Sequence, residues 1–180
     1  MEHGFFSDYS KMLSNTLTSF DWSPVLKLGK MIEKAWRDGN QVFLCGNGGS
    51  AGNANHIAND LIFAVSEGKI PGIKASALTA NPAVLTCLAN DLGYEHIFSE
   101  QLSVLGNKGD ILIALSGSGN SPNIIKVLKQ AKKMQLYSAA ILGFSGGSSK
   151  NFVDLPIHLE INDMQMAEDI QIIIGHMIMK

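Results

Sequence analysis

The chain has 180 residues, of which 46% are hydrophobic and 17% charged, and its formal net charge is -2. This balance is typical of one compact domain with a substantial core, and it argues against a disordered chain or a nucleic-acid-binding surface. No segment approaches the roughly 20 uninterrupted apolar residues of a membrane span, and the stretch MEHGFFSDYSK lacks the basic and apolar regions of a secretory signal, so we expect a cytoplasmic protein without a membrane or nucleic-acid partner.

Two helices are predicted at the N-terminal end. Between Ser7 and about Asp38, apolar residues recur at intervals of three and four positions, which is the period of a helix with one apolar face. The pattern breaks near the sequence DWSP. There, Asp21 or Ser23 is a suitable cap for the second helix, and Pro24 fits its first turn.

Strands and helices alternate through the rest of the chain. Five short apolar runs have the composition of strands buried on both faces of a parallel sheet, and they span residues 41–46, 73–78, 110–116, 137–144 and 155–161. Helical patterns cover residues 53–64, 82–91, 98–106, 121–135 and 165–180, the last being apolar nearly all round. We predict a single domain of the α/β class, a three-layer α/β/α sandwich with a mainly parallel sheet. Another element or another subunit should cover part of the last helix.

Two loops rich in glycine and serine follow predicted strands. GNGGS spans residues 46–50 and SGSGNSPN spans residues 116–123, and a helical pattern follows each loop. In an open parallel sheet, ligands bind at the carboxyl ends of the strands. Glycine allows a phosphate to approach the backbone, amides of the first helical turn point at it, and serine hydroxyls add hydrogen bonds. The loops lack the Gly-Lys-Ser/Thr ending of a P-loop and a Gly-x-Gly-x-x-Gly fingerprint, so ATP and NAD are not expected.

A histidine and an aspartate follow the first loop on its predicted helix. His56 and Asp60 are four residues apart, so they share one helix face and are placed to clamp one ion or one substrate. Cys45 and Cys87 lie in apolar runs without the spacing of a metal motif. Their placement predicts reduced, buried thiols.

Four motifs stand out along the chain: GNGGSA with the following His56, LTANPAVLTCLANDLGYEHIF, GDILIALSGSGNSPN, and a late helix ending in IIIGH. Together they resemble the sugar isomerase (SIS) domain family, and within it the phosphoheptose isomerases. The resemblance implies a flavodoxin-like sheet and a homotetramer with active sites between subunits. It also implies conversion of sedoheptulose 7-phosphate to D-glycero-D-manno-heptose 7-phosphate, which supplies heptose for lipopolysaccharide or capsule. Residues 1–38 would then form helices for oligomerisation and residues 40–180 the sugar-phosphate-binding core.

The resemblance implies roles for individual residues. Those that correspond to the phosphate binders are Ser50, Ser116, Ser118 and Ser121, and those that correspond to sugar contacts are Asn47 and Asp91. Gly48, Gly49, Gly117 and Gln165 complete the substrate-binding set. The implied catalytic residues are Asp60, Glu168 and His176. The implied ligands of a divalent metal are His56, Asp60, Glu168 and His176, where imidazoles favour zinc and leave manganese and nickel as alternatives.

Two residues depart from the family pattern. Asp60 stands where these isomerases normally carry glutamate, and the loss of one methylene moves a carboxylate by roughly 1 Å or more, enough to displace a catalytic base. Glu168 stands where they usually carry glutamine, eight residues before His176 and thus about 12 Å away along an unbroken helix. The base is therefore Asp60, or else Glu168 or His176 takes over part of its role. Under the second alternative, the enzyme tolerates Asp60→Asn better than Glu168→Gln.

Two other functions fit the same motifs. An isomerase of another sugar phosphate would use the same phosphate loops. A non-catalytic SIS tetramer that acts as a replication-initiator-associating protein would resemble the isomerases closely in sequence. Such a protein has no need for the four implied metal ligands together, so the sequence favours an enzyme, a phosphosugar isomerase that catalyses an intramolecular oxidoreduction.

Overall fold

The computed structural model describes residues 3–63 and 71–180. Its strands form one sheet in the order β2-β1-β3-β4-β5, in which every neighbouring pair is parallel. The strands are β1 (Val42–Gly46), β2 (Ala75–Ala77), β3 (Ile111–Ser116), β4 (Tyr137–Leu142) and β5 (Leu155–His158). Each lies within a run predicted from the sequence, and the order 2-1-3-4-5 is that of flavodoxin-like folds.

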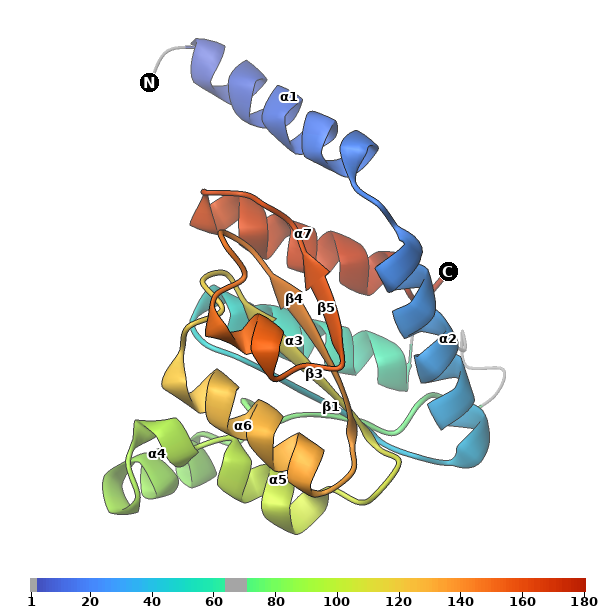
Figure 1. The fold of residues 1–180 in the computed structure, drawn as a ribbon, viewed down its shortest axis with the longest axis vertical. Coiled ribbons are helices and arrows are strands. Elements are labelled where there is room, and N and C mark those ends of the chain that lie inside the picture. Colours follow the sequence, from blue (N-terminus) through green and yellow to red (C-terminus); the bar gives the residue numbers. More distant parts are fainter. Residues whose placement is uncertain (1–2, 64–70) are drawn as a thin grey trace.

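Helices cover both faces of the sheet (Figure 1). They are α1 (His3–Ser19), α2 (Ser23–Asp38), α3 (Gly49–Ile62), α4 (Pro82–Asp91), α5 (Ser99–Leu105), α6 (Pro122–Lys133) and α7 (Met164–Met177), with 3-10 turns η2 (Tyr94–His96) and η3 (Ser148–Asn151). One core cluster joins the sheet to α2, α3 and α7, and a second joins it to α5 and α6. Alternate residues of β1 enter the two clusters, Val42 the first and Phe43 the second. The predicted three-layer α/β/α sandwich is therefore confirmed.

The boundaries of the helices differ little from the predictions. Helix α3 begins at Gly49 rather than at residue 53, because the glycine-rich loop itself forms the first turn. The predicted end of this helix, Ala64, lies outside the described residues. Trp22 precedes α2 without a side-chain cap, so the predicted caps are wrong, although Asp21 accepts hydrogen bonds from the Ser23 amide and hydroxyl.

The N-terminal helix α1 projects from the sandwich (Figure 1), and Tyr9 connects it to α7. The Tyr9 hydroxyl donates a hydrogen bond of 2.6 Å to Asp169 Oδ2, and this bond raises the pKa of Tyr9 to about 12. Phe5, Phe6 and Met12 on the same helix are more than half exposed. Helix α1 is thus attached on one side and leaves apolar side chains uncovered on another.

The two cysteines differ in their surroundings. Cys45 is buried in β1, and desolvation raises the pKa of its thiol. Cys87 is exposed, so the prediction that it is buried is wrong. The reason is that α4, despite its apolar sequence, has no buried side chain. Among the described residues, no helix combines the length and apolar character needed to cross a bilayer.

Helices α3 and α7 lie side by side in the layer they share. Asn53 Nδ2 on α3 donates to the Glu168 carbonyl at 2.8 Å and to Gln171 Oε1 at 3.1 Å on α7. One turn further along each helix, Ile57 packs against Gly175, where an added Cβ would lie 2.6 Å from Ile57 Cγ1. Glycine at position 175 therefore permits the close approach of the two helices.

We predict that Gly175→Ala destabilises the protein by about 1 to 3 kcal/mol, because the new methyl group overpacks a buried contact. The matched control is Gly29→Ala on α2, where nothing lies within 4 Å of the added Cβ. That change should raise stability by about 0.5 to 1 kcal/mol, as expected for glycine in a helix interior. Urea denaturation of both variants measures the effects, and equal stability of Gly175→Ala and wild type would show that residue 175 does not set the helix spacing.

Candidate active site

The two glycine and serine loops meet at the carboxyl edge of the sheet. Strands β1 and β3 are neighbours, yet α3 after β1 packs on one face and α6 after β3 packs on the other. After these two neighbouring strands the chain therefore continues on opposite faces of the sheet. Ligands bind at such a position in open α/β sheets. A hollow of about 90 Å³ lies here, and its lining consists of Asn47, Ser50, Leu115, Ser116, Gly117, Ser118, Ser121, Met164 and Glu168. The structure therefore brings together all four predicted phosphate-binding serines.

The hollow is suited to an anion. It is far smaller than the roughly 300 to 1,000 Å³ of pockets for drug-sized ligands. Helix α3 begins at its edge after Gly48, and α6 begins there after Ser121, with Pro122 in the first turn. The first amides of both helices lack intrahelical acceptors and favour negative charge. These amides and the serine hydroxyls match the predicted phosphate site.

Hydrogen bonds from backbone amides hold the second loop, residues 116–123, in place. The Gly119 amide donates to Ser116 Oγ at 3.1 Å, which leaves the hydroxyl proton of this serine available to a ligand. The Ser149 amide donates to the Gly119 carbonyl at 2.9 Å, so the segment with the sequence FSGGSS supports the loop. Only 6% of Ser116 is exposed. The loop is therefore fixed before any ligand binds.

Three of the predicted metal ligands converge between α3 and α7. His56 Nε2 lies 3.1 Å from His176 Nε2 and 3.2 Å from Asp60 Oδ2, and His176 Nε2 lies 3.5 Å from the same carboxylate oxygen. Ligands in a tetrahedron around zinc at about 2.0 to 2.1 Å are about 3.3 to 3.4 Å apart. The three separations and the donor set of two imidazoles and one carboxylate therefore fit a zinc-sized cation.

Asp60 reaches this cluster in spite of its short side chain. Oδ2 faces both histidines, and Oδ1 accepts a hydrogen bond of 3.2 Å from Asn59 Nδ2. The side chain is 16% exposed. An orienting hydrogen bond on the second oxygen of a metal-binding carboxylate is a common device for fixing the geometry of the site.

Glu168 is not brought to the other three predicted ligands. It lines the anion hollow, and a Cβ at position 49 would overlap its carboxylate. The absence of a side chain at Gly49 thus makes room for Glu168 at the first turn of α3. Its metal and base roles stay predictions, and about 12 Å of helix separates it from His176.

The remaining predicted residues lie at different distances from the hollow. Asn47 and Gly117 line it, and Gly48 and Gly49 open α3 beside it. Asp91 is exposed at the end of α4, where its carboxylate accepts from Asn90 at 2.8 Å. Gln165 is exposed in the first turn of α7. Neither of these two lines the hollow, and their substrate contacts stay predictions.

Sequence reasoning missed two residues at the site. Asn123 is 1% exposed and exchanges two hydrogen bonds with Asn47, at 2.8 and 2.9 Å. Tyr94 donates its hydroxyl to Asn47 Oδ1 at 3.0 Å. The sequence did hold a signal for each: Asn123 lies within SGSGNSPN, directly after the proline that begins α6, and Tyr94 lies within the motif LTANPAVLTCLANDLGYEHIF.

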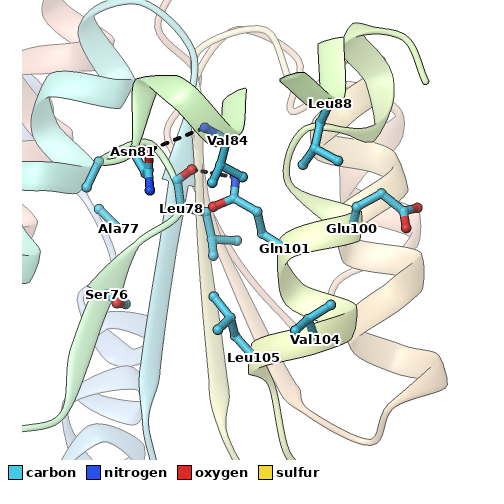
Figure 2. A pocket seen from close by; sticks show the side chains of 11 residues that line it. Ser76, Ala77, Leu78, Asn81, Val84, Leu88, Glu100, Gln101, Val104 and Leu105 are labelled. Atoms are coloured by element: carbon cyan, nitrogen blue, oxygen red, sulfur yellow. Dashed lines mark hydrogen bonds between the residues drawn. The ribbon is translucent and has the colours of Figure 1, made fainter. Parts of the chain in front are cut away.

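A larger hollow lies elsewhere in the molecule. Its volume is about 580 Å³. It lies between β2, α4 and α5, and its lining consists mainly of apolar side chains such as Leu78, Val84 and Leu105 (Figure 2). It contains none of the predicted site residues and no convergent donors like those of the anion hollow. The chemistry of the described residues therefore assigns the candidate site to the smaller hollow and the cluster of His56, Asp60 and His176.

Comparisons with known proteins show which family and fold the chain is similar to. The family model of the SIS domain matches residues 4–143. A phosphoheptose isomerase from Chlorobaculum parvum is 37% identical over 174 residues, which cover 96% of this chain and 83% of that protein. One from Clostridium acetobutylicum is 38% identical over 166 residues, covering 86% and 83%. The structure of a phosphoheptose isomerase from Francisella tularensis is similar with a TM-score of 0.91 at 26% identity, over 98% of this chain and 93% of that one.

We predict that the protein binds zinc through the cluster of His56, Asp60 and His176. Because removing even an outer hydrogen-bond partner of a metal ligand costs 10- to 100-fold in affinity, His176→Gln should weaken zinc binding by at least about tenfold. His158→Gln is the control, since His158 Nε2 contacts the Phe144 carbonyl outside the cluster. Competition with a chromophoric chelator measures both affinities, and equal zinc affinity in the two variants would contradict the assignment.

Proposed function

Because the chain belongs to the SIS domain family, and within it to the phosphoheptose isomerases, we propose that it converts sedoheptulose 7-phosphate to D-glycero-D-manno-heptose 7-phosphate. The product would supply heptose to lipopolysaccharide or capsule synthesis from the cytoplasm. The observation that carries the proposal is the placement of an anion hollow and a cation cluster along the same two helices. Ser50 at the hollow precedes His56 by six residues, or about 9 Å of helix, a distance comparable with the extended length of a sugar phosphate.

The hollow would hold the phosphate and the cluster would face the reacting carbons. The amides of the loops and the hydroxyls of Ser50, Ser116, Ser118 and Ser121 fix the phosphate end. With that end held, C1 and C2 of the ketose reach the cluster of His56, Asp60 and His176. Fixing both ends in this way supplies the orientation that proton transfer requires.

The isomerisation moves one proton between carbons and one between oxygens. In our proposal the Asp60 carboxylate removes a proton from C1 of the ketose, which gives an enediolate, and the same carboxyl returns a proton to C2. His176 moves a proton between the two neighbouring oxygens, so the reaction is balanced without a co-reactant. Asp60 suits this role better than Glu168 because Glu168 lies at the phosphate end.

The donor set would hold a divalent metal, and we propose zinc. His56, Asp60 and His176 would bind it, and such an ion polarises a carbonyl and stabilises the negative charge that develops on its oxygen. Glu168 as a fourth ligand would require its side chain to leave the anion hollow.

An assay with sedoheptulose 7-phosphate, with chelator and with added zinc, tests the function. We expect formation of the aldose phosphate, loss of activity in chelator and recovery with zinc. Turnover of a shorter sugar phosphate in preference to the heptulose would favour the alternative substrate. A metal-loaded protein that turns over neither would favour the non-catalytic, replication-initiator-associating alternative.

We predict that Ser118→Ala weakens binding of the phosphorylated sugar. A hydrogen bond to a charged group contributes about 1.5 to 3 kcal/mol, so KM should rise by roughly tenfold to a hundredfold. Ser103→Ala on α5 is the control, because its hydroxyl bonds only the Glu100 carbonyl within the described chain. An unchanged KM in Ser118→Ala would count against the phosphate role.

The two altered carboxylates should respond differently to substitution. Asp60→Asn should lower the turnover number by about 10² to 10⁴, the usual cost of losing a general base. Glu168→Gln should keep most of the turnover and lower KM, because it removes a negative charge beside the phosphate. Turnover at saturating substrate and zinc separates these roles. The reverse pattern, with an active Asp60→Asn and an inactive Glu168→Gln, would return the base role to Glu168.

We also propose that the protein is a homotetramer, or at least a dimer, with the helices around Leu13 to Trp36 and Met164 to Met179 in its interfaces. The support is apolar surface that one chain leaves uncovered on these helices, such as Phe5 at 59% exposure on α1 and Leu26 at 61% on α2. Light scattering should give about four times the 19.4 kDa of one chain. A monomer at micromolar concentration would end this proposal.

A further inference from the structure

The side chain of Asn47 is held by three hydrogen bonds. Asn47 Nδ2 donates to Asn123 Oδ1 at 2.9 Å, and Asn123 Nδ2 donates back to Asn47 Oδ1 at 2.8 Å. The Tyr94 hydroxyl donates to the same Asn47 oxygen at 3.0 Å. The carbonyl oxygen of Asn47 therefore uses both of its lone pairs, and its amide group retains one N–H without a partner among the described residues.

The free N–H belongs to a residue that lines the anion hollow. Since the oxygen of Asn47 is saturated, the side chain offers a ligand only a hydrogen-bond donor. This matches the serine hydroxyls and helix amides around it, which also donate. Without the partners, the Asn47 amide is free to rotate and present its oxygen, which a negatively charged ligand would repel.

The partners of Asn47 are themselves fixed. Asn123 is 1% exposed at the start of α6, so its amide has little freedom. Tyr94 is 59% exposed. The turn that carries it, η2, is held by contacts to Lys126 of α6. Lys126 Nζ lies 2.7 Å from His96 Nε2 and 3.6 Å from the Glu95 carboxylate. Asn123 and Tyr94 are therefore both held in place, and together they fix the orientation of the Asn47 side chain.

We infer that Asn123 and Tyr94 are positioning residues that lock the Asn47 amide as a hydrogen-bond donor to an oxygen of the phosphorylated substrate. The inference rests on the proposed function, because that function supplies the ligand. Asn123 and Tyr94 affect substrate binding only by holding the Asn47 amide in position. Neither residue needs to touch the substrate.

A double-mutant cycle tests this dependence. Tyr94→Phe removes one neutral hydrogen bond and should lower kcat/KM for sedoheptulose 7-phosphate by about 2- to 12-fold in the wild-type background. In the Asn47→Ala background, the same change should have less than about a twofold effect, because the group it acts through is gone. Tyr137→Phe is the control, since the hydroxyl of Tyr137 has no hydrogen bond within the part of the chain that the structure describes. Equal losses in both backgrounds, or no loss in the wild type, would overturn the inference.

The side-chain amide signals of Asn47 in an NMR spectrum give a readout that needs no substrate. Asn47→Asp identifies these signals by removing them. Tyr94→Phe and Asn123→Leu should shift them and speed their hydrogen exchange, and Tyr137→Phe should leave them unchanged. Unaltered Asn47 signals in Tyr94→Phe would overturn the inference even if Asn123→Leu does not fold. A wild type without turnover that still shows these shifts would contradict the proposed function and leave the positioning role supported.

Discussion

Ile57 on α3 packs where residue 175 of α7 has no side chain, and this contact sets the distance between the two helices. Because the helices stay close over several turns, His176 on one reaches His56 and Asp60 on the other. The hydrogen bonds from Asn53 to α7 fix their relative position along the axis. A wider spacing would leave His56 and Asp60 together on α3 but separate His176 from them, so the cluster would lose one of its three ligands. The metal chemistry proposed for the protein therefore depends on a packing contact between apolar groups.

Helices α3 and α7 also place the anion hollow and the cation cluster at opposite ends of the site. The first turn of α3 lies at the anion hollow, and Met164 at the start of α7 lines it too. Asp60 and His176 lie in the last turns of α3 and α7. The N-terminus of a helix favours anions and its C-terminus favours cations. The two helix dipoles thus favour a phosphate at one end of the site and a metal ion at the other.

No lysine or arginine lines the anion hollow among the described residues. Its donors are neutral hydroxyls and amides, which recognise a phosphate by the direction of their hydrogen bonds rather than by opposite charge. This makes the orientation of each donor important, and it explains why the Asn47 amide is held on both sides. The carboxylate of Glu168 is the one charged group in the lining. A glutamine there would remove this charge and keep the size of the side chain.

The pattern of residues along the chain was enough to predict the layers of the fold and the position of the loops. Apolar runs fix the strands through burial, and glycine and serine mark the loops because few other residues allow an anion so near the backbone. The tertiary structure decided what depends on contacts between distant residues. Periodicity placed His56 and Asp60 on one face, but only the approach of α7 brought His176 to them and kept Glu168 at the phosphate end. Cys87 is exposed for a similar reason, since the apolar sequence of α4 does not reveal that the helix packs at the edge of the core with no side chain fully buried. Local pattern specifies which residues can be buried or can bind, and the distances between elements decide which of them do.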